Sequence, residues 1–131
     1  MTSLYTFNKL EKLKSRKALD YLFKEGKAFL IHPFKVSYII EQNTKGKINC
    51  GVGVSKRNFS KAVDRNRIKR LMREVYRLNK LPLHQVIAEN DIMFFILFID
   101  KKVPEKSIDL ENKMQQVILK LVENYTHALD K

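Results

Sequence analysis

The residues most able to do chemistry in this chain are cations crowded into one short segment. Residues 56–80 hold ten basic side chains and two acidic ones, so they contribute +8 to a formal net charge of +12 over 131 residues. Guanidinium groups offer planar hydrogen-bond donors that match phosphate oxygens and base edges, whereas ammonium groups act as point charges. The segment therefore predicts binding to a polyanion, with RNA or DNA phosphates as the first candidate.

A helix over about Lys61–Asn79 would gather these cations on one side. At about 100° per residue, five of them fall within an arc of about 140°: Arg65, Lys69, Arg70, Arg73 and Arg77. The apolar side chains predicted to pack on the rest of the protein lie on the other side: Ile68, Leu71, Met72, Val75 and Leu78. The pattern predicts a helix with one buried face and one cationic stripe, which also contains Asn66.

An ordinary solvated helix face is the alternative explanation of this stripe. Such a face usually mixes charges of both signs, whereas here cations four residues apart repel one another by a few tenths of a kcal/mol per pair. Bound anions would offset this repulsion, so the pattern favours a nucleic-acid surface.

A catalytic site built from protein side chains is not visible in the sequence. His32, His84 and His127 are far apart, and no Gly-rich phosphate loop or nucleophile motif occurs. Cys50, the single cysteine, excludes an internal disulfide and a thiolate metal cage, and its apolar neighbours favour a small buried residue. We therefore predict no catalytic residue and no metal ligand in the protein itself.

Periodicity and turn residues predict the elements that position the cationic helix. The predicted elements are a helix at about Ser15–Glu25, strands at Lys27–Ile31, Phe34–Glu41 and Ile48–Ser55, the helix at Lys61–Asn79 ended by Leu81–Pro82, a strand at Asp91–Ile99, and a last helix starting near Asp109. The order α-β-β-β-α-β-α indicates an α+β fold with one sheet and three helices, in a single domain over 1–131 with a basic lead at 1–14.

Several finer features follow from the same patterns. Asn43–Gly46 is a turn signal expected to close a hairpin between the second and third strands. Gly51 and Gly53 share one strand face and would let another element approach closely. In Asp91–Ile99 the residues on both faces of the predicted strand are apolar, which is typical of a central strand. The last helix is predicted to bury one stripe, made of Leu110, Met114, Val117, Leu121 and Tyr125.

The composition adds limits on location. The N-terminal residues 1–17 are polar and basic, without the apolar stretch of a signal peptide, and the longest apolar run, Ile92–Ile99, is far shorter than a membrane span. We expect a cytoplasmic protein with no membrane partner.

In its basic segment and flanking motifs, the sequence resembles the protein component of bacterial ribonuclease P. The basic segment carries the family's central motif, Arg65-Asn66-Arg67-Ile68-Lys69-Arg70, preceded by Ser55-Lys56-Arg57. Further matches keep the family's order: Leu13-Lys14-Ser15, Leu22 to Lys27, Gly51 to Ser55, and Asp91 to Phe95. Together the matches span roughly residues 7–125.

The resemblance implies a fold and a set of binding residues. The family's fold is an α-β-β-β-α-β-α sandwich resembling the second domain of ribosomal protein S5, with a left-handed crossover at the Arg-rich helix. Contact with the catalytic RNA is implied for Lys56, Arg57, Lys61, Arg65, Arg67, Lys69 and Arg70. A cleft between the first helix and the sheet holds the 5′ leader of precursor tRNA in this family, and the matching positions are Phe23, Ser37, Asn66 and Arg73.

The resemblance also implies a function. The protein would bind ribonuclease P RNA, expected at 1:1, and precursor tRNA, while the RNA with Mg²⁺ removes the leader. The chain departs from the family at Leu19, where a Phe is usual, at Ser37, where an aromatic is common, and at Asn58–Ser60, a loop one residue longer than usual. Two other functions stay open: a structured-RNA binding module on the same fold, and a DNA-binding protein that inserts the Arg-rich helix in a major groove.

Overall fold

The computed structural model describes residues 16–42 and 45–129. Its elements, in chain order, are α1 (Arg16–Glu25), β1 (Lys27–Ile31), β2 (Phe34–Glu41), β3 (Ile48–Val54), α2 (Ala62–Asn79), α3 (Leu81–Val86), β4 (Asp91–Phe98) and α4 (Ile108–Leu129). Every predicted element is present, and the α+β class is confirmed. The predicted cap Ser15 and the turn residues Asn43 and Thr44 lie outside the described residues.

One short helix was not predicted. α2 ends at Asn79, as expected ahead of Leu81–Pro82, but Pro82 then lies in the first turn of α3. Proline fits the first turn of a helix because its missing N–H would have no intrahelical partner there. The Leu81–Pro82 pair that follows α2 therefore forms the start of α3.

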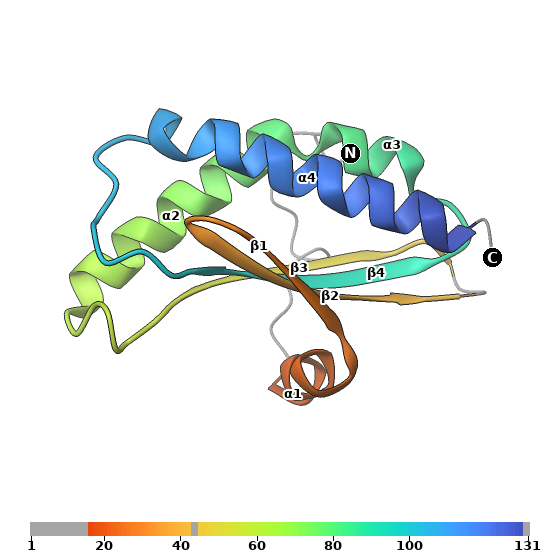
Figure 1. Cartoon of the computed structure of the whole chain (residues 1–131), viewed down its shortest axis with the longest axis horizontal. Helices are drawn as coiled ribbons and strands as arrows, with labels where there is room; N and C mark the ends of the chain where they lie inside the picture. Colours follow the sequence, from red (N-terminus) through yellow and green to blue (C-terminus); the bar gives the residue numbers. More distant parts are fainter. Residues whose placement is uncertain (1–15, 43–44, 130–131) are drawn as a thin grey trace.

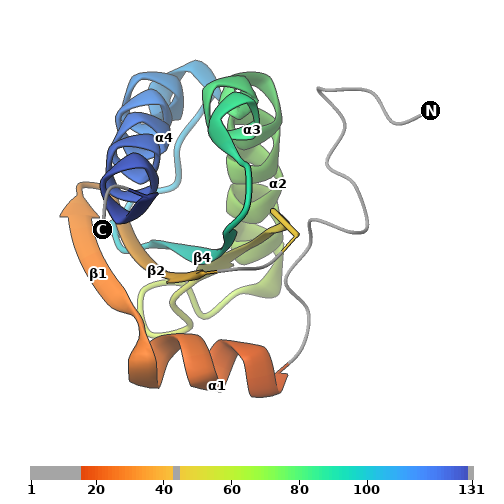
Figure 2. The same cartoon turned by 90° about the vertical axis from the view of Figure 1, so that its right-hand side faces the viewer.

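The helices cover the two faces of the sheet unequally. α1 lies against one face, and α2, α3 and α4 form a layer on the other (Figures 1 and 2).

None of the helices in the described ranges is long and apolar enough to cross a membrane.

The sheet has the strand order β1-β2-β4-β3. β1 and β2 form an antiparallel hairpin, β4 pairs antiparallel with β2, and β3 pairs parallel with β4. The predicted hairpin between β2 and β3 is therefore wrong, because β4 lies between them. The predicted central position of β4 is confirmed, and a strand that buries both faces belongs inside a covered sheet. The likeness to ribosomal protein S5 and the hand of the crossover from β3 to β4 stay predictions.

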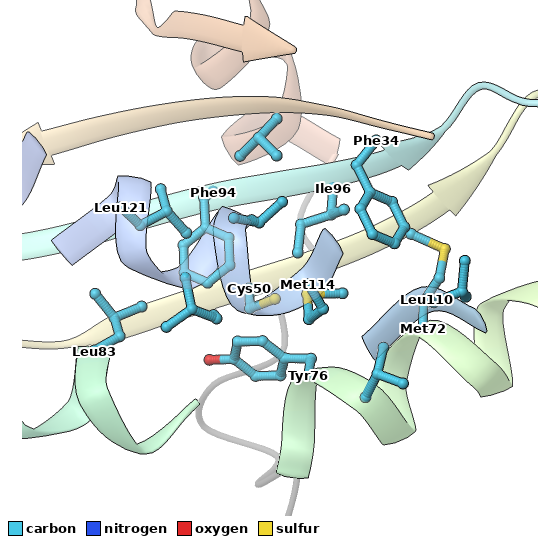
Figure 3. Close-up of a cluster of buried hydrophobic side chains, with 14 of the residues drawn as sticks. Phe34, Cys50, Met72, Tyr76, Leu83, Phe94, Ile96, Leu110, Met114 and Leu121 are labelled. Atoms are coloured by element: carbon cyan, nitrogen blue, oxygen red, sulfur yellow. The ribbon is translucent and has the colours of Figure 1, made fainter. Parts of the chain in front are cut away.

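The main core lies between the sheet and the layer of three helices (Figure 3). Alternate residues of β4 are at most 1% exposed there: Ile92, Phe94, Ile96 and Phe98. The predicted stripe of α4 is also buried throughout, from Leu110 to Tyr125, and Cys50 is 1% exposed, as a small apolar residue should be.

α1 is held on the opposite face by a single buried side chain and a close backbone contact. Leu22 is fully buried, while the helix exposes most of its other residues. Gly26, directly after the helix, lies so near the sheet that an added Cβ would come within 2.5 Å of the Leu22 carbonyl oxygen and 2.7 Å of that of Tyr38. Glycine is needed here for close approach, and no left-handed backbone is involved.

The Tyr125 hydroxyl ties α4 to the connection between α3 and β4. It accepts hydrogen bonds from the backbone N–H groups of Ala88 (3.0 Å) and Asn90 (3.2 Å), and it donates one to the Asn90 carbonyl (2.7 Å). One buried phenol thus satisfies three backbone groups beside the start of the central strand.

We predict that Tyr125→Phe lowers the free energy of unfolding by about 1–3 kcal/mol, because buried backbone groups lose their partner without a change in packing. Urea denaturation would measure this. Tyr21→Phe is the matched control, since Tyr21 is 44% exposed on α1, and it should change stability by less than about 0.5 kcal/mol. Equal stabilities for the two variants would contradict the role given to the hydroxyl.

Candidate nucleic-acid interface

α2 has one buried, apolar side and an opposite side that carries cations. Ile68, Met72, Val75 and Tyr76 are its buried residues. The opposite side carries a basic stripe, which we define as Arg67, Lys69, Arg70, Arg73 and Arg77. Arg67, Arg70 and Arg73 are exposed, whereas Lys69 and Arg77 are half-buried. The sequence prediction of a helix with one apolar and one cationic face is confirmed.

The buried face of α2 is nevertheless rotated from its predicted position. Leu78, predicted to be buried, is 45% exposed, and Tyr76, which had no predicted place in the core, is fully buried. The ring of Tyr76 packs edge-on against Phe94 of the central strand, with centroids 5.8 Å apart. On an ideal helix Tyr76 lies only about 20° from Arg65, so burying it also draws Arg65 toward the protein.

The stripe carries little internal neutralisation. Arg77 approaches Glu74 at 4.0 Å across one turn, and both side chains are partly exposed, so the pair contributes little. Arg67 donates to the backbone oxygen of Glu105 at 3.3 Å. In the described residues, Arg70 and Arg73 form no ion pair or hydrogen bond. These two guanidinium groups keep all their donors for a partner.

The loop between β3 and α2 adds two more exposed cations, Lys56 and Arg57. The Arg57 amide donates to the Ser55 hydroxyl (3.2 Å), and the Phe59 amide donates to the Ser55 carbonyl (3.1 Å). Phe59 is only 6% exposed and packs on Phe98, with ring centroids 6.0 Å apart. The loop therefore has an ordered turn and a buried anchor. Lys61, also exposed, precedes the first residue of α2.

A groove of about 460 Å³ runs between α1 and the sheet. Its lining includes Phe23 and Phe95, whose rings meet edge-to-face at 5.5 Å, together with Ser37 and two lysines, Lys27 and Lys35. Phe23 is 54% exposed although it is a large apolar residue. Lys35 shares the groove face with Ser37 and Phe95, and aromatic faces beside a lysine suit the bases and phosphates of a single strand.

Strand register explains how this groove is built. Phe95 on β4 has Ser37 opposite it on β2 and Gly51 opposite it on β3. These small neighbours leave room for the ring, which extends over Gly53, where an added Cβ would lie 2.4 Å from the ring's Cζ. The predicted close approach is confirmed at Gly53, where the approaching group is the Phe95 ring, and at Gly51 it stays a prediction.

The predicted leader residues do not all lie in this groove. Phe23 and Ser37 line it, whereas Asn66 and Arg73 are exposed on α2, which packs on the other face of the sheet. Sequence reasoning missed Phe95 and Lys35 as groove residues. The available signal was the pair of glycines on the neighbouring strand, but using it required the register between β3 and β4.

The described ranges, 16–42 and 45–129, contain no group of three or more His, Cys, Asp or Glu side chains able to hold a metal ion. His32 approaches Asp100 at 3.7 Å on the surface, away from the groove. Burial raises the pKa of the Tyr38 phenol, which also lies outside the groove lining.

Comparisons with known proteins agree with this architecture. The family model described as Ribonuclease P matches residues 7–122. The chain is 37% identical over 129 residues to the ribonuclease P protein component of Porphyromonas gingivalis, covering 95% of this chain and 93% of that protein. It is 34% identical over 120 residues to the component from Dictyoglomus turgidum, covering 92% of each. A solved RNase P protein from Staphylococcus aureus shares the fold, with a TM-score of 0.55 at 22% identity, covering 86% of this chain and 95% of that one.

We predict that Gly53→Ala displaces the Phe95 ring and breaks its contact with Phe23, because the new methyl group would overlap the ring. Overpacking of this kind lowers stability by about 1–3 kcal/mol. Nuclear Overhauser contacts between the two rings, with urea denaturation alongside, would measure both effects. Asn49→Ala, on the same face of β3, is the control and should leave the ring contact intact. A preserved contact in Gly53→Ala would refute the packing argument.

Proposed function

The chain belongs to the ribonuclease P protein family, and from that membership we propose that it binds the enzyme's catalytic RNA and the 5′ leader of precursor tRNA. The resemblance predicted from the basic segment is thereby confirmed. As a protein component of ribonuclease P, the chain is part of an endoribonuclease holoenzyme.

The observation that carries the proposal is the basic stripe on α2, in which Arg70 and Arg73 have no counter-ion among the described residues. Lys69, Arg73 and Arg77 follow one another at four-residue spacing, where like charges repel. In the described residues, neither Arg70 nor Arg73 has an acidic partner. Phosphates would remove this repulsion and release condensed counter-ions from the RNA.

We assign the catalytic RNA to the basic stripe and the loop before it. Arg67, Lys69 and Arg70 on α2 continue the cationic surface that begins with Lys56, Arg57 and Lys61. Arginine forks bind phosphate oxygens in pairs, which gives geometric definition as well as affinity. We expect one protein to bind one RNA, in the cytoplasm.

We assign the leader to the groove between α1 and the sheet. The exposed ring of Phe23, supported by Phe95, offers a base a stacking surface, and Lys35 suits the phosphates. Contacts of these types tolerate many sequences. Ser37, where an aromatic residue is common in the family, leaves space above Phe95. Asn66 and Arg73 on α2 would meet the leader or adjoining tRNA outside the groove.

In this proposal the hydrolytic chemistry resides in the RNA subunit, and Mg²⁺ bound there would supply Lewis-acid activation of phosphate and water. The protein contributes affinity and selects the precursor over the mature tRNA. A structured-RNA binding module without a role in cleavage is the competing function, because the same fold can serve both.

The test is reconstitution of the purified protein with a bacterial ribonuclease P RNA at low Mg²⁺. We expect strong stimulation of precursor tRNA cleavage at the mature 5′ end, and no cleavage by the protein alone. Tight RNA binding without stimulation would instead support the structured-RNA binding module. Absence of RNA binding would overturn both.

The leader assignment predicts that Phe23→Ala lowers the affinity for precursor tRNA about 5- to 100-fold, the equivalent of one lost base stack. The affinity for mature tRNA should not change, because it lacks the leader. Filter binding to the reconstituted holoenzyme would measure both affinities. Tyr21→Ala is the control, since Tyr21 is a comparably exposed aromatic on α1 outside the groove lining. Equal effects on precursor and mature tRNA would exclude this assignment.

A further inference from the structure

Arg65 lies near the start of α2, but its guanidinium group turns back toward the preceding loop. Its Nη1 donates to the carbonyl oxygens of Phe59 and Ser60, each at 2.8 Å. A cation near a helix N-terminus is disfavoured by the helix dipole, so the two carbonyl oxygens stabilise it there. Within the described chain, Lys61 at the N-cap makes no side-chain cap bond. Arg65 instead holds the backbone just before the helix through its bonds to Phe59 and Ser60.

Asn58 ties the same loop to the sheet. Its Nδ2 donates to the carbonyl oxygen of Ile99 at 3.1 Å, just after the central strand, and lies 3.5 Å from that of Asp100. The buried ring of Phe59 adds an apolar anchor on Phe98. Asn58 therefore ties the loop to the end of β4, and Arg65 ties the next two residues of the loop to α2.

We call Arg65 and Asn58 the clamp, because they hold residues 58–60. Lys56 and Arg57 lie in the turn between this clamped segment and the end of β3. Both are exposed, and their side chains form no hydrogen bond or ion pair among the described residues. The backbone that carries them is fixed by the Ser55 hydroxyl and carbonyl on one side and by the clamp on the other. Their cationic groups thus project from an ordered backbone.

We infer that Arg65 and Asn58 are positioning residues that hold Lys56 and Arg57 in place for the catalytic RNA, and that Arg65 is not chiefly a phosphate contact. The inference rests on the proposed function. A loop ordered before binding loses less conformational entropy when the RNA arrives. Arg70 is the contrasting case: it is exposed and, in the described residues, has no partner, so its donors serve a phosphate directly.

The first test needs no RNA. Amide hydrogen exchange in the free protein should become faster at residues 57–61 in Arg65→Met, which keeps the aliphatic stem and removes the donors, and also in Asn58→Ala. Arg70→Ala should leave exchange at these amides unchanged. Unchanged exchange in both clamp variants would overturn the inference, whatever the RNA measurements show.

The second test is a double-mutant cycle on affinity for ribonuclease P RNA over a range of salt concentrations. Arg65→Met and Asn58→Ala should each weaken binding on the order of tenfold, without changing the slope of log K against log salt. Neither should weaken binding further in a Lys56→Ala/Arg57→Ala background. Arg70→Ala should reduce the slope by about 0.7–0.9. Its loss of affinity should add to that of Lys56→Ala/Arg57→Ala, the loop variant.

The outcomes separate the inference from the function on which it rests. If Arg65→Met reduces the salt slope and its loss adds fully to that of the loop variant, Arg65 is a direct phosphate contact and the inference fails while the function stands. If the unmodified protein does not bind the RNA, the proposed function fails. Asn58→Ala carries no change in charge, so it keeps the test valid should Arg65→Met fold poorly.

Discussion

The structure depends on one strand that is apolar on both of its faces. β4 inserts Ile92, Phe94, Ile96 and Phe98 into the core beneath the layer of three helices. Phe95, on the other face, supports the groove beneath α1. A strand of this kind must be covered on both sides. That requirement places β4 inside the sheet, makes β3 an edge strand, and sends the intervening chain across the sheet as α2 and α3.

The two candidate surfaces share this strand. Tyr76 packs on Phe94 and fixes the rotation of α2, which sets which cations face solvent. One residue further along β4, Phe95 holds the exposed ring of Phe23 from the opposite side. Adjacent side chains of β4 therefore set the geometry of the basic stripe and of the groove. The spacing of the two candidate surfaces is therefore fixed by one sheet.

Sequence patterns predicted the elements well and their arrangement less well, for a physical reason. Periodicity reports the burial of each segment, and so the bounds of β1, β2 and α2 and the buried stripe of α4 could be predicted. The turn at Asn43–Gly46 is a local signal that does not encode strand order, which is decided by where β4 buries its two faces. Tyr76 shows a similar limit: an amphipathic residue at the edge of the cationic arc is drawn into the core by a partner on another element.

The same limit applies to the site, where charge is visible in sequence but availability is not. Arg65 and Arg70 belong to one basic run, and nothing in their spacing distinguishes them. The difference arises in the tertiary structure, because the carbonyl oxygens of Phe59 and Ser60 converge on Arg65, whereas Arg70 faces open solvent. Counting cations along a helix therefore overestimates the number that are available to a partner. Arg65 instead binds the protein's own backbone. The loop that it holds carries Lys56 and Arg57, so the contribution of these two cations depends on Arg65.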